Sequence, residues 1–123
     1  MKLSLKKTLV LGASENALRY SNMAIRKLSQ HKIETVAIGN KSGDVEGVKI
    51  EKEQFLFENI HTITLYLNPN NQEQYKEYIL SLKPERVIFN PGTENSVFEK
   101  ELIAKGIDAI EACTLVMLST DQF

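Results

Sequence analysis

The residues best suited to chemistry follow two short apolar runs. Gly12-Ala13-Ser14 comes directly after Thr8–Leu11, and Asn40-Lys41 comes one residue after Thr35–Ile38. A glycine turn that opens a helix offers backbone N–H groups and a hydroxyl to an anion such as a phosphate. The Asn40 amide could reach a ribose or a base edge, and the Lys41 ammonium suits a phosphate on that ribose. Together the two segments predict a site for a phosphorylated nucleotide, although singly Gly12 could merely turn the chain and Lys41 could be a solvated loop lysine.

The best-known nucleotide motifs are incomplete in this sequence. The dinucleotide pattern G-x-G-x-x-G has Ser14 and Ala17 where its second and third glycines would stand, and no G-x-x-x-x-G-K-[ST] occurs. NAD-binding domains carry an acid at the end of their second strand, where this chain has Asn40. The patterns therefore disfavour NAD and the hydrolysis of nucleoside triphosphates.

Groups that could act in catalysis are few. Cys113 is the one cysteine, which excludes an internal disulfide, and no base in the sequence is an evident partner for it. His31 stands where a helix should end and fits a capping role, while His61 opens a strand. We therefore expect no catalytic residue and no metal site. An acyl-transferring or NAD(P)-dependent enzyme that uses Cys113 is the alternative.

Composition limits the classes of protein to consider. The 123 residues suit one domain, and 42% hydrophobic with 25% charged residues is typical of a globular chain. Fifteen basic and 16 acidic residues give a net charge of −1, which disfavours a nucleic-acid partner. No apolar run approaches the roughly 18 residues of a membrane span, and the charged segment 1–7 is too short for a signal peptide. The expected location is the cytoplasm, with no membrane partner.

Short apolar runs alternate with longer amphipathic stretches along the whole chain. This pattern predicts an α/β fold, Rossmann-like and doubly wound, with a mostly parallel sheet of five or six short strands and helices on both faces. Ser21 is the expected N-cap of the first helix, and Gly43 and Gly47 punctuate a polar loop before a short edge strand. The expected strands are Thr8–Leu11, Thr35–Ile38, Val48–Ile50, Thr62–Leu67, Arg86–Asn90 and Ile107–Ile110. Because such sheets bind ligands beyond the carboxyl ends of their strands, the site should lie there.

An ordered set of segments resembles a known family. These segments are Leu9–Ser14, Arg19-Tyr20-Ser21, Val36–Lys41, Tyr66–Pro69, Phe89–Gly92 and Glu111–Cys113. The set resembles the small stand-alone CoA-binding proteins, which are similar to the N-terminal CoA-binding domain of the succinyl-CoA synthetase α subunit. The resemblance implies that Gly12, Ala13 and Ser14 hold the pyrophosphate, flanked by Tyr20 and Ser21. It also implies that Asn40 and Lys41 meet the 3′-phosphate region and that the Tyr66–Pro69 loop lines the adenine side.

Three segments depart from the family pattern. Lys41 follows Asn40 without the usual proline, Phe89–Gly92 replaces a Trp-x-Gln-x-Gly-like segment, and Glu111-Ala112-Cys113 replaces Asp-Arg-Cys. These departures leave open a changed ligand, or a degenerate domain that serves as a protein-interaction module.

The resemblance and the residues together predict one CoA-binding domain over residues 1–123. It would bind CoA or an acyl-CoA without catalysis, as a carrier, sensor or regulatory module, and a protein partner is possible. The expected cofactor-binding residues are Gly12, Ala13, Ser14, Arg19, Tyr20, Ser21, Gly39, Asn40, Lys41, Tyr66, Leu67, Asn68, Pro69, Asn90 and Gly92.

Overall fold

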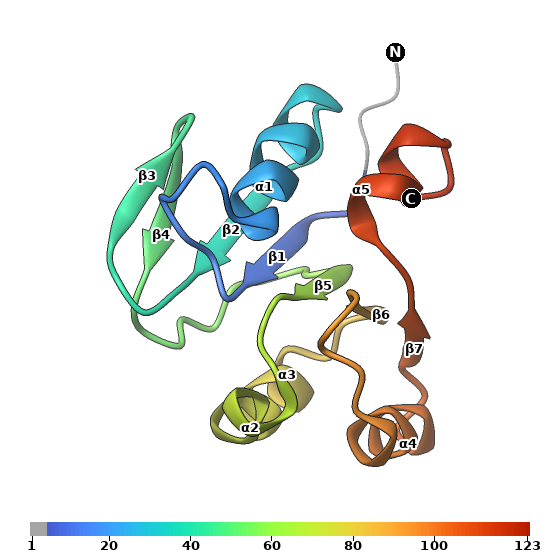
Figure 1. Ribbon diagram of the computed structural model, residues 1–123. Coiled ribbons are helices and arrows are strands. Elements are labelled where there is room, and N and C mark those ends of the chain that lie inside the picture. Colours follow the sequence, from blue (N-terminus) through green and yellow to red (C-terminus); the bar gives the residue numbers. More distant parts are fainter. Residues whose placement is uncertain (1–4) are drawn as a thin grey trace.

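The computed structural model describes residues 5–123, which form strands and helices that alternate except between β2 and β5 (Figure 1). Residues 1–4, which begin the segment that is expected to be too short for a signal peptide, lie outside the described residues. The elements in order are β1 (Thr8–Leu11), α1 (Tyr20–Gln30), β2 (Thr35–Ile38), β3 (Gly43–Val45), β4 (Val48–Glu51), β5 (Thr62–Leu65), α2 (Pro69–Gln72), the 3-10 turn η1 (Glu73–Tyr75), α3 (Lys76–Leu82), β6 (Arg86–Phe89), α4 (Ser96–Ala104), β7 (Asp108–Glu111) and α5 (Thr114–Ser119).

The strands form one sheet in the order β3-β4-β2-β1-β5-β6-β7. Every neighbouring pair is parallel except the β3–β4 hairpin. The Rossmann-like, mostly parallel α/β fold predicted from the sequence is thus confirmed. The predicted number of strands was too low, because the described residues form seven strands.

The additional strand, β3, comes from the segment expected to be a polar loop. It pairs with β4 through a turn in which Glu46 has φ 49° and Gly47 has φ 87°. Two successive residues with positive φ favour the tight turn of a hairpin. The strand escaped prediction because it has three residues and buries only Val45.

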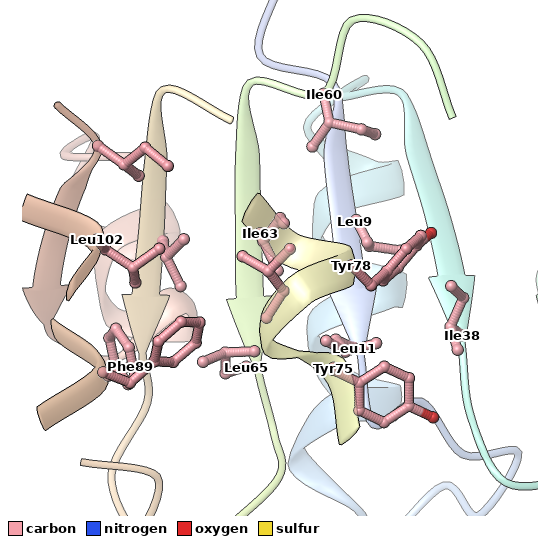
Figure 2. Close-up of a cluster of buried hydrophobic side chains, with 14 residues drawn as sticks. Leu9, Leu11, Ile38, Ile60, Ile63, Leu65, Tyr75, Tyr78, Phe89 and Leu102 are labelled. Atoms are coloured by element: carbon pink, nitrogen blue, oxygen red, sulfur yellow. The ribbon is translucent and has the colours of Figure 1, made fainter. Parts of the chain in front are cut away.

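Helices cover both faces of the sheet. Alternate strand residues such as Leu9 and Leu11 point to one face, where they join a core with Tyr75 and Tyr78 (Figure 2). The residues between them, such as Val10, point to the other face and pack with side chains of α1 and α5. The strands β1 and β5 are therefore buried on both faces, as expected for a parallel sheet that helices cover on both sides.

The start of the first helix differs from the prediction. Arg19, rather than Ser21, occupies the N-cap position of α1, and Ser21 is buried within its first turn. The Asn16 side chain turns the preceding loop by accepting a hydrogen bond from Leu18 N at 2.9 Å, and Asn16 O accepts one from Arg19 N at 3.0 Å. The loop after β1 therefore runs to Arg19 before the helix begins.

The order of the strands creates a crevice. From β1 the chain proceeds to β2 and the β3–β4 hairpin on one side, and it then returns to β5 on the other side of β1. The connections that leave β1 and β5 diverge at their carboxyl ends, and ligands of open α/β sheets bind at such a switch point.

No helix within residues 5–123 is both long and apolar enough to cross a membrane.

Candidate ligand-binding site

A cavity of about 990 Å³ lies at the carboxyl ends of β1, β2, β5 and β6. Pockets for small molecules and cofactors usually measure about 300–1,000 Å³, so this cavity is at the large end of that range. Its lining comes from four loops and consists of Gly12–Asn16, Leu18–Ser21, Gly39–Ser42, Tyr66–Asn68, Asn71, Tyr75 and Pro91–Thr93. The structure therefore brings together segments that lie far apart in the sequence.

Most of the residues expected to bind a cofactor line this cavity. The exceptions are Pro69, which begins α2, and Asn90, which is buried beneath the cavity. The lining also contains residues that are not among the expected cofactor-binding residues: Glu15, Asn16, Leu18, Ser42, Asn71, Tyr75, Pro91 and Thr93. Of these, Tyr75 also belongs to the hydrophobic core.

Two glycines let the loops approach one another backbone to backbone. A Cβ at Gly12, where φ is +96°, would lie 2.9 Å from Tyr66 O. A Cβ at Gly39 would lie 2.2 Å from Ala13 O. The loops after β1, β2 and β5 consequently meet in a way that no larger residue would allow at these two positions.

The loop after β1 presents different donors from those expected. Gly12 N and Ala13 N both donate to Ile38 O, each at 2.9 Å, so neither N–H group is free for a phosphate. Ser14 Oγ accepts a hydrogen bond from Asn16 N at 3.0 Å, which leaves its own hydroxyl hydrogen for a ligand. The resemblance assigned Gly12 and Ala13 to the pyrophosphate, and in the structure their N–H groups instead fix the loop to β2.

Buried polar groups hold the same loop from below. Asn22 Nδ2 donates to Ser14 O at 3.0 Å, and Asn22 Oδ1 accepts from Arg26 Nε at 2.8 Å. Asn22 is only 3% exposed, so its amide lies on the inner side of α1. These bonds attach the loop to the first helix and position the Ser14 hydroxyl.

The charged groups of the lining favour an anion. Arg19 and Lys41 are exposed, and neither forms an ion pair within the described part of the chain. Glu15 is the one acidic residue among the described residues of the lining, and its Oε2 accepts a hydrogen bond from Asp44 N at 2.9 Å. With two cations and one anion, the described side chains of the lining carry a net positive charge.

Asn90 was expected to contact a cofactor, but in the structure its side chain forms hydrogen bonds within the fold. Its Nδ2 donates to Thr64 Oγ1 at 2.6 Å and to Leu65 O at 2.8 Å, and its Oδ1 accepts from Thr114 N at 2.9 Å. The residue is 2% exposed, and neither Asn90 nor these partners are part of the lining of the cavity. Asn90 therefore joins β5, β6 and α5, because a side chain just past a strand can point into the fold as readily as out of it.

Gln72 holds two loops of the lining and was missed by sequence reasoning. Its buried Nε2 donates to Leu67 O at 2.8 Å and to Thr93 O at 2.7 Å. Its Oε1 accepts from Asn95 Nδ2 at 2.9 Å. The only signal in the sequence is a polar residue at the end of α2, which does not distinguish a buried amide from a solvated one.

Tyr66 lies at the switch point with an unpaired hydroxyl. The residue is part of the lining of the cavity, while its Oη is buried and makes no hydrogen bond. Burial raises the pKa of Tyr66 to about 12, and the nearby hydroxyls of Thr64 and Thr114 hydrogen-bond each other at 2.8 Å. The phenol is therefore neutral at physiological pH.

Neither the cysteine nor the histidines reach the cavity. Cys113 is half-buried at the N-cap of α5 and is not part of the lining. His31 caps the end of α1, with its Nδ1 2.9 Å from Lys27 O, as expected. His61 precedes β5 at the opposite edge of the sheet, and burial is the main cause that lowers its pKa below 6.5. Residues 5–123 contain no group of three His, Cys, Asp or Glu side chains that could hold a metal ion.

Solved structures show close relatives of this fold. A crystal structure of an uncharacterized protein is 48% identical in sequence, covers 98% of this chain and 99% of its own, and has a TM-score of 0.95. A hypothetical protein from Pyrococcus horikoshii OT3 has a TM-score of 0.84 at 21% identity, covering 94% of this chain and 82% of its own. A redesigned PH1109 protein also has a TM-score of 0.84, at 17% identity, covering 95% of this chain and 83% of its own. The last two likenesses show the fold alone.

A comparison with models of protein families shows the family of this chain. No curated protein matches the sequence. Residues 6–119, in contrast, match the family model described as the CoA binding domain, so the match extends from just before β1 to the end of α5. The chain therefore belongs to the CoA-binding domain family.

Proposed function

We propose that the protein binds CoA or an acyl-CoA in this cavity without transforming it, and that it acts as a carrier, sensor or regulatory module. The observation that carries the proposal is the cavity at the switch point, with Arg19 and Lys41 on its rim and no carboxylate paired to either among residues 5–123. CoA is a polyanion with a pyrophosphate and a 3′-phosphate, so it suits a rim with two available cations. Family membership supports the same ligand.

Apolar groups on the rim of the cavity support binding of the pantetheine arm or acyl chain of the ligand. Leu18 is 85% exposed and Tyr20 is 69% exposed, and both line the cavity. Exposed apolar side chains at a pocket are typical of surfaces that a ligand covers. A pantetheine arm, or an acyl chain attached to it, offers apolar atoms for this contact.

The position of Cys113 supports binding over catalysis. A nucleophile must lie against the reacting atom with a base in reach, and Cys113 lies outside the lining of the cavity. The enzyme that would use Cys113 therefore has less support than the binding module.

A thermal-shift panel tests the proposal. A ligand at 100 times its Kd stabilises a protein by about 2.7 kcal/mol, which for 123 residues is a rise in Tm of about 10 °C. CoA, acetyl-CoA and longer acyl-CoAs should raise the Tm, and NAD at the same concentration should raise it less. No shift with any CoA compound at millimolar concentration would refute CoA binding and favour the degenerate interaction module.

An activity assay tests the absence of catalysis. The purified protein should hydrolyse no acyl-CoA and should neither oxidise nor reduce a nicotinamide cofactor. Thioester cleavage that is lost in Cys113→Ser, and kept when a cysteine-remote residue such as Lys49 is changed to alanine, would show an enzyme.

A further inference from the structure

Glu15 reaches from the loop after β1 to the β3–β4 hairpin. Its Oε2 accepts a hydrogen bond from Asp44 N at 2.9 Å, so the side chain bridges the loop after β1 and strand β3. Its other carboxylate oxygen makes no hydrogen bond, and Glu15 forms no ion pair in the described range 5–123. One oxygen is thus held by the protein and the other remains available to a ligand.

Gly43 makes room for this carboxylate. A Cβ at Gly43 would lie 2.3 Å from Glu15 Cδ and 2.7 Å from Glu15 Oε2. Any other residue at position 43 would push the carboxylate away from Asp44 N. The position of the charge therefore depends on a glycine as well as on a hydrogen bond.

The carboxylate lies against Gly43 and Asp44, where the segment that follows β2 enters β3, and Asn40 and Lys41 of that segment line the same cavity. In nucleotide-binding α/β folds, the adenosine ribose reaches this end of the second strand, and an acid there accepts a hydrogen bond from a ribose hydroxyl. No acid directly follows β2 in this sequence, but Glu15 brings a carboxylate from a different loop to the far end of the segment that follows β2. A carboxylate suits a hydroxyl donor and repels a phosphate, whereas the Lys41 ammonium attracts a phosphate.

We propose that Glu15 determines specificity at the adenosine end of the ligand by accepting a hydrogen bond from the ribose 2′-hydroxyl, while Lys41 faces the 3′ position. This inference rests on the proposed binding of CoA. It goes further by requiring a ribose with a free 2′-hydroxyl.

A cycle of two ligands and two proteins isolates this contact. The ligands are 3′-dephospho-CoA and its 2′-deoxyadenosine analogue, and the proteins are the wild type and Glu15→Gln, titrated by calorimetry. The wild type should bind the hydroxylated ligand about 10-fold or more tightly than the deoxy analogue, as a charge-assisted hydrogen bond implies. In Glu15→Gln this ratio should fall to about threefold or less, because a neutral amide accepts a weaker hydrogen bond.

Two further variants separate position from charge. Gly43→Ala keeps the carboxylate but displaces it, so the ratio should fall as it does in Glu15→Gln. Glu46→Gln removes the same charge from the exposed turn of the β3–β4 hairpin, outside the cavity, and should leave the ratio at the wild-type value. Melting curves establish that each variant is folded.

The outcomes distinguish this inference from the proposed function. A ratio near one in the wild type, or an unchanged ratio in Glu15→Gln, would overturn the role of Glu15 while leaving CoA binding intact. Failure of the wild type to bind any form of CoA would overturn the proposed function, and this inference with it.

Discussion

Gly39→Ala should damage both the fold and the site. The new Cβ would lie 2.2 Å from Ala13 O, 3.1 Å from Ala13 C and 3.2 Å from Ile50 Cγ2. A comfortable separation of a carbon from its neighbours is nearer 3.5 Å, so the Ala13 carbonyl would have to move by about 1 Å. That movement is resisted, because Ala13 N donates to Ile38 O at 2.9 Å and Gly39 N donates to Glu51 O at 2.9 Å.

The expected cost follows from this crowding. Overpacking of a well-packed interior costs about 1–3 kcal/mol. For 123 residues, 1 kcal/mol corresponds to about 4 °C in Tm, so the melting temperature should fall by about 4–12 °C. The loop that carries Ser14 should also shift, and the affinity for CoA should fall with it.

Circular-dichroism melting and CoA titration measure these effects, with Gly43→Ala as the matched control for stability. The three atoms nearest to a Cβ at Gly43 all belong to the flexible Glu15 side chain, so Gly43→Ala should change the Tm by little. If Gly39→Ala has the same Tm and the same affinity for CoA as the wild type, the close approach of the two loops is not needed for stability or binding, and this description of the cavity is wrong.

Four other changes give separate tests. Lys41→Ala should reduce the preference for CoA over 3′-dephospho-CoA by about 10-fold at unchanged Tm; calorimetry that shows equal losses for both ligands would place this lysine elsewhere. Asn90→Ala should lose about 2–4 kcal/mol in urea denaturation, because it leaves Thr114 N–H and other buried groups unpaired, and wild-type stability would refute its structural role. Tyr66→Phe should leave the Tm unchanged or raise it, since the buried hydroxyl has no partner, and a clear loss of stability would show a missed hydrogen bond. Because the pKa of His61 is lowered in the folded state, the unfolded chain takes up a proton at His61 more readily, so the free energy of unfolding should fall as the pH decreases below 6.5. His61→Gln should weaken this pH dependence when it is measured by urea denaturation. A free energy of unfolding that rises on acidification would contradict the prediction.

The fold could be predicted because the central strands are buried on both faces. Runs such as Thr8–Leu11 and Thr62–Leu65 are wholly buried in the structure, and burial of this kind requires helices on both sides of a parallel sheet. The β3 strand could not be predicted in the same way. It lies at the edge of the sheet, where a hairpin needs little apolar sequence.

The site could be predicted only as far as topology determines it. Parallel strands bring their carboxyl ends to one edge, so segments such as Gly12–Ser14 and Gly39–Lys41 had to meet there. Topology does not determine where a side chain points. Asn90 points inward to three hydrogen-bond partners, and Glu15 reaches β3 because of a glycine 28 residues further along the chain.

The central claim, that CoA occupies the cavity at the carboxyl ends of the strands, is tested most directly by titrating the ¹⁵N-labelled protein with CoA and following its backbone amide signals by NMR. Saturable shifts should concentrate in the residues that line the cavity, in the four loops after β1, β2, β5 and β6. The amide of His61, at the opposite edge of the sheet, should not shift. Spectra that do not change at millimolar CoA, or shifts that concentrate around His61, would contradict the claim.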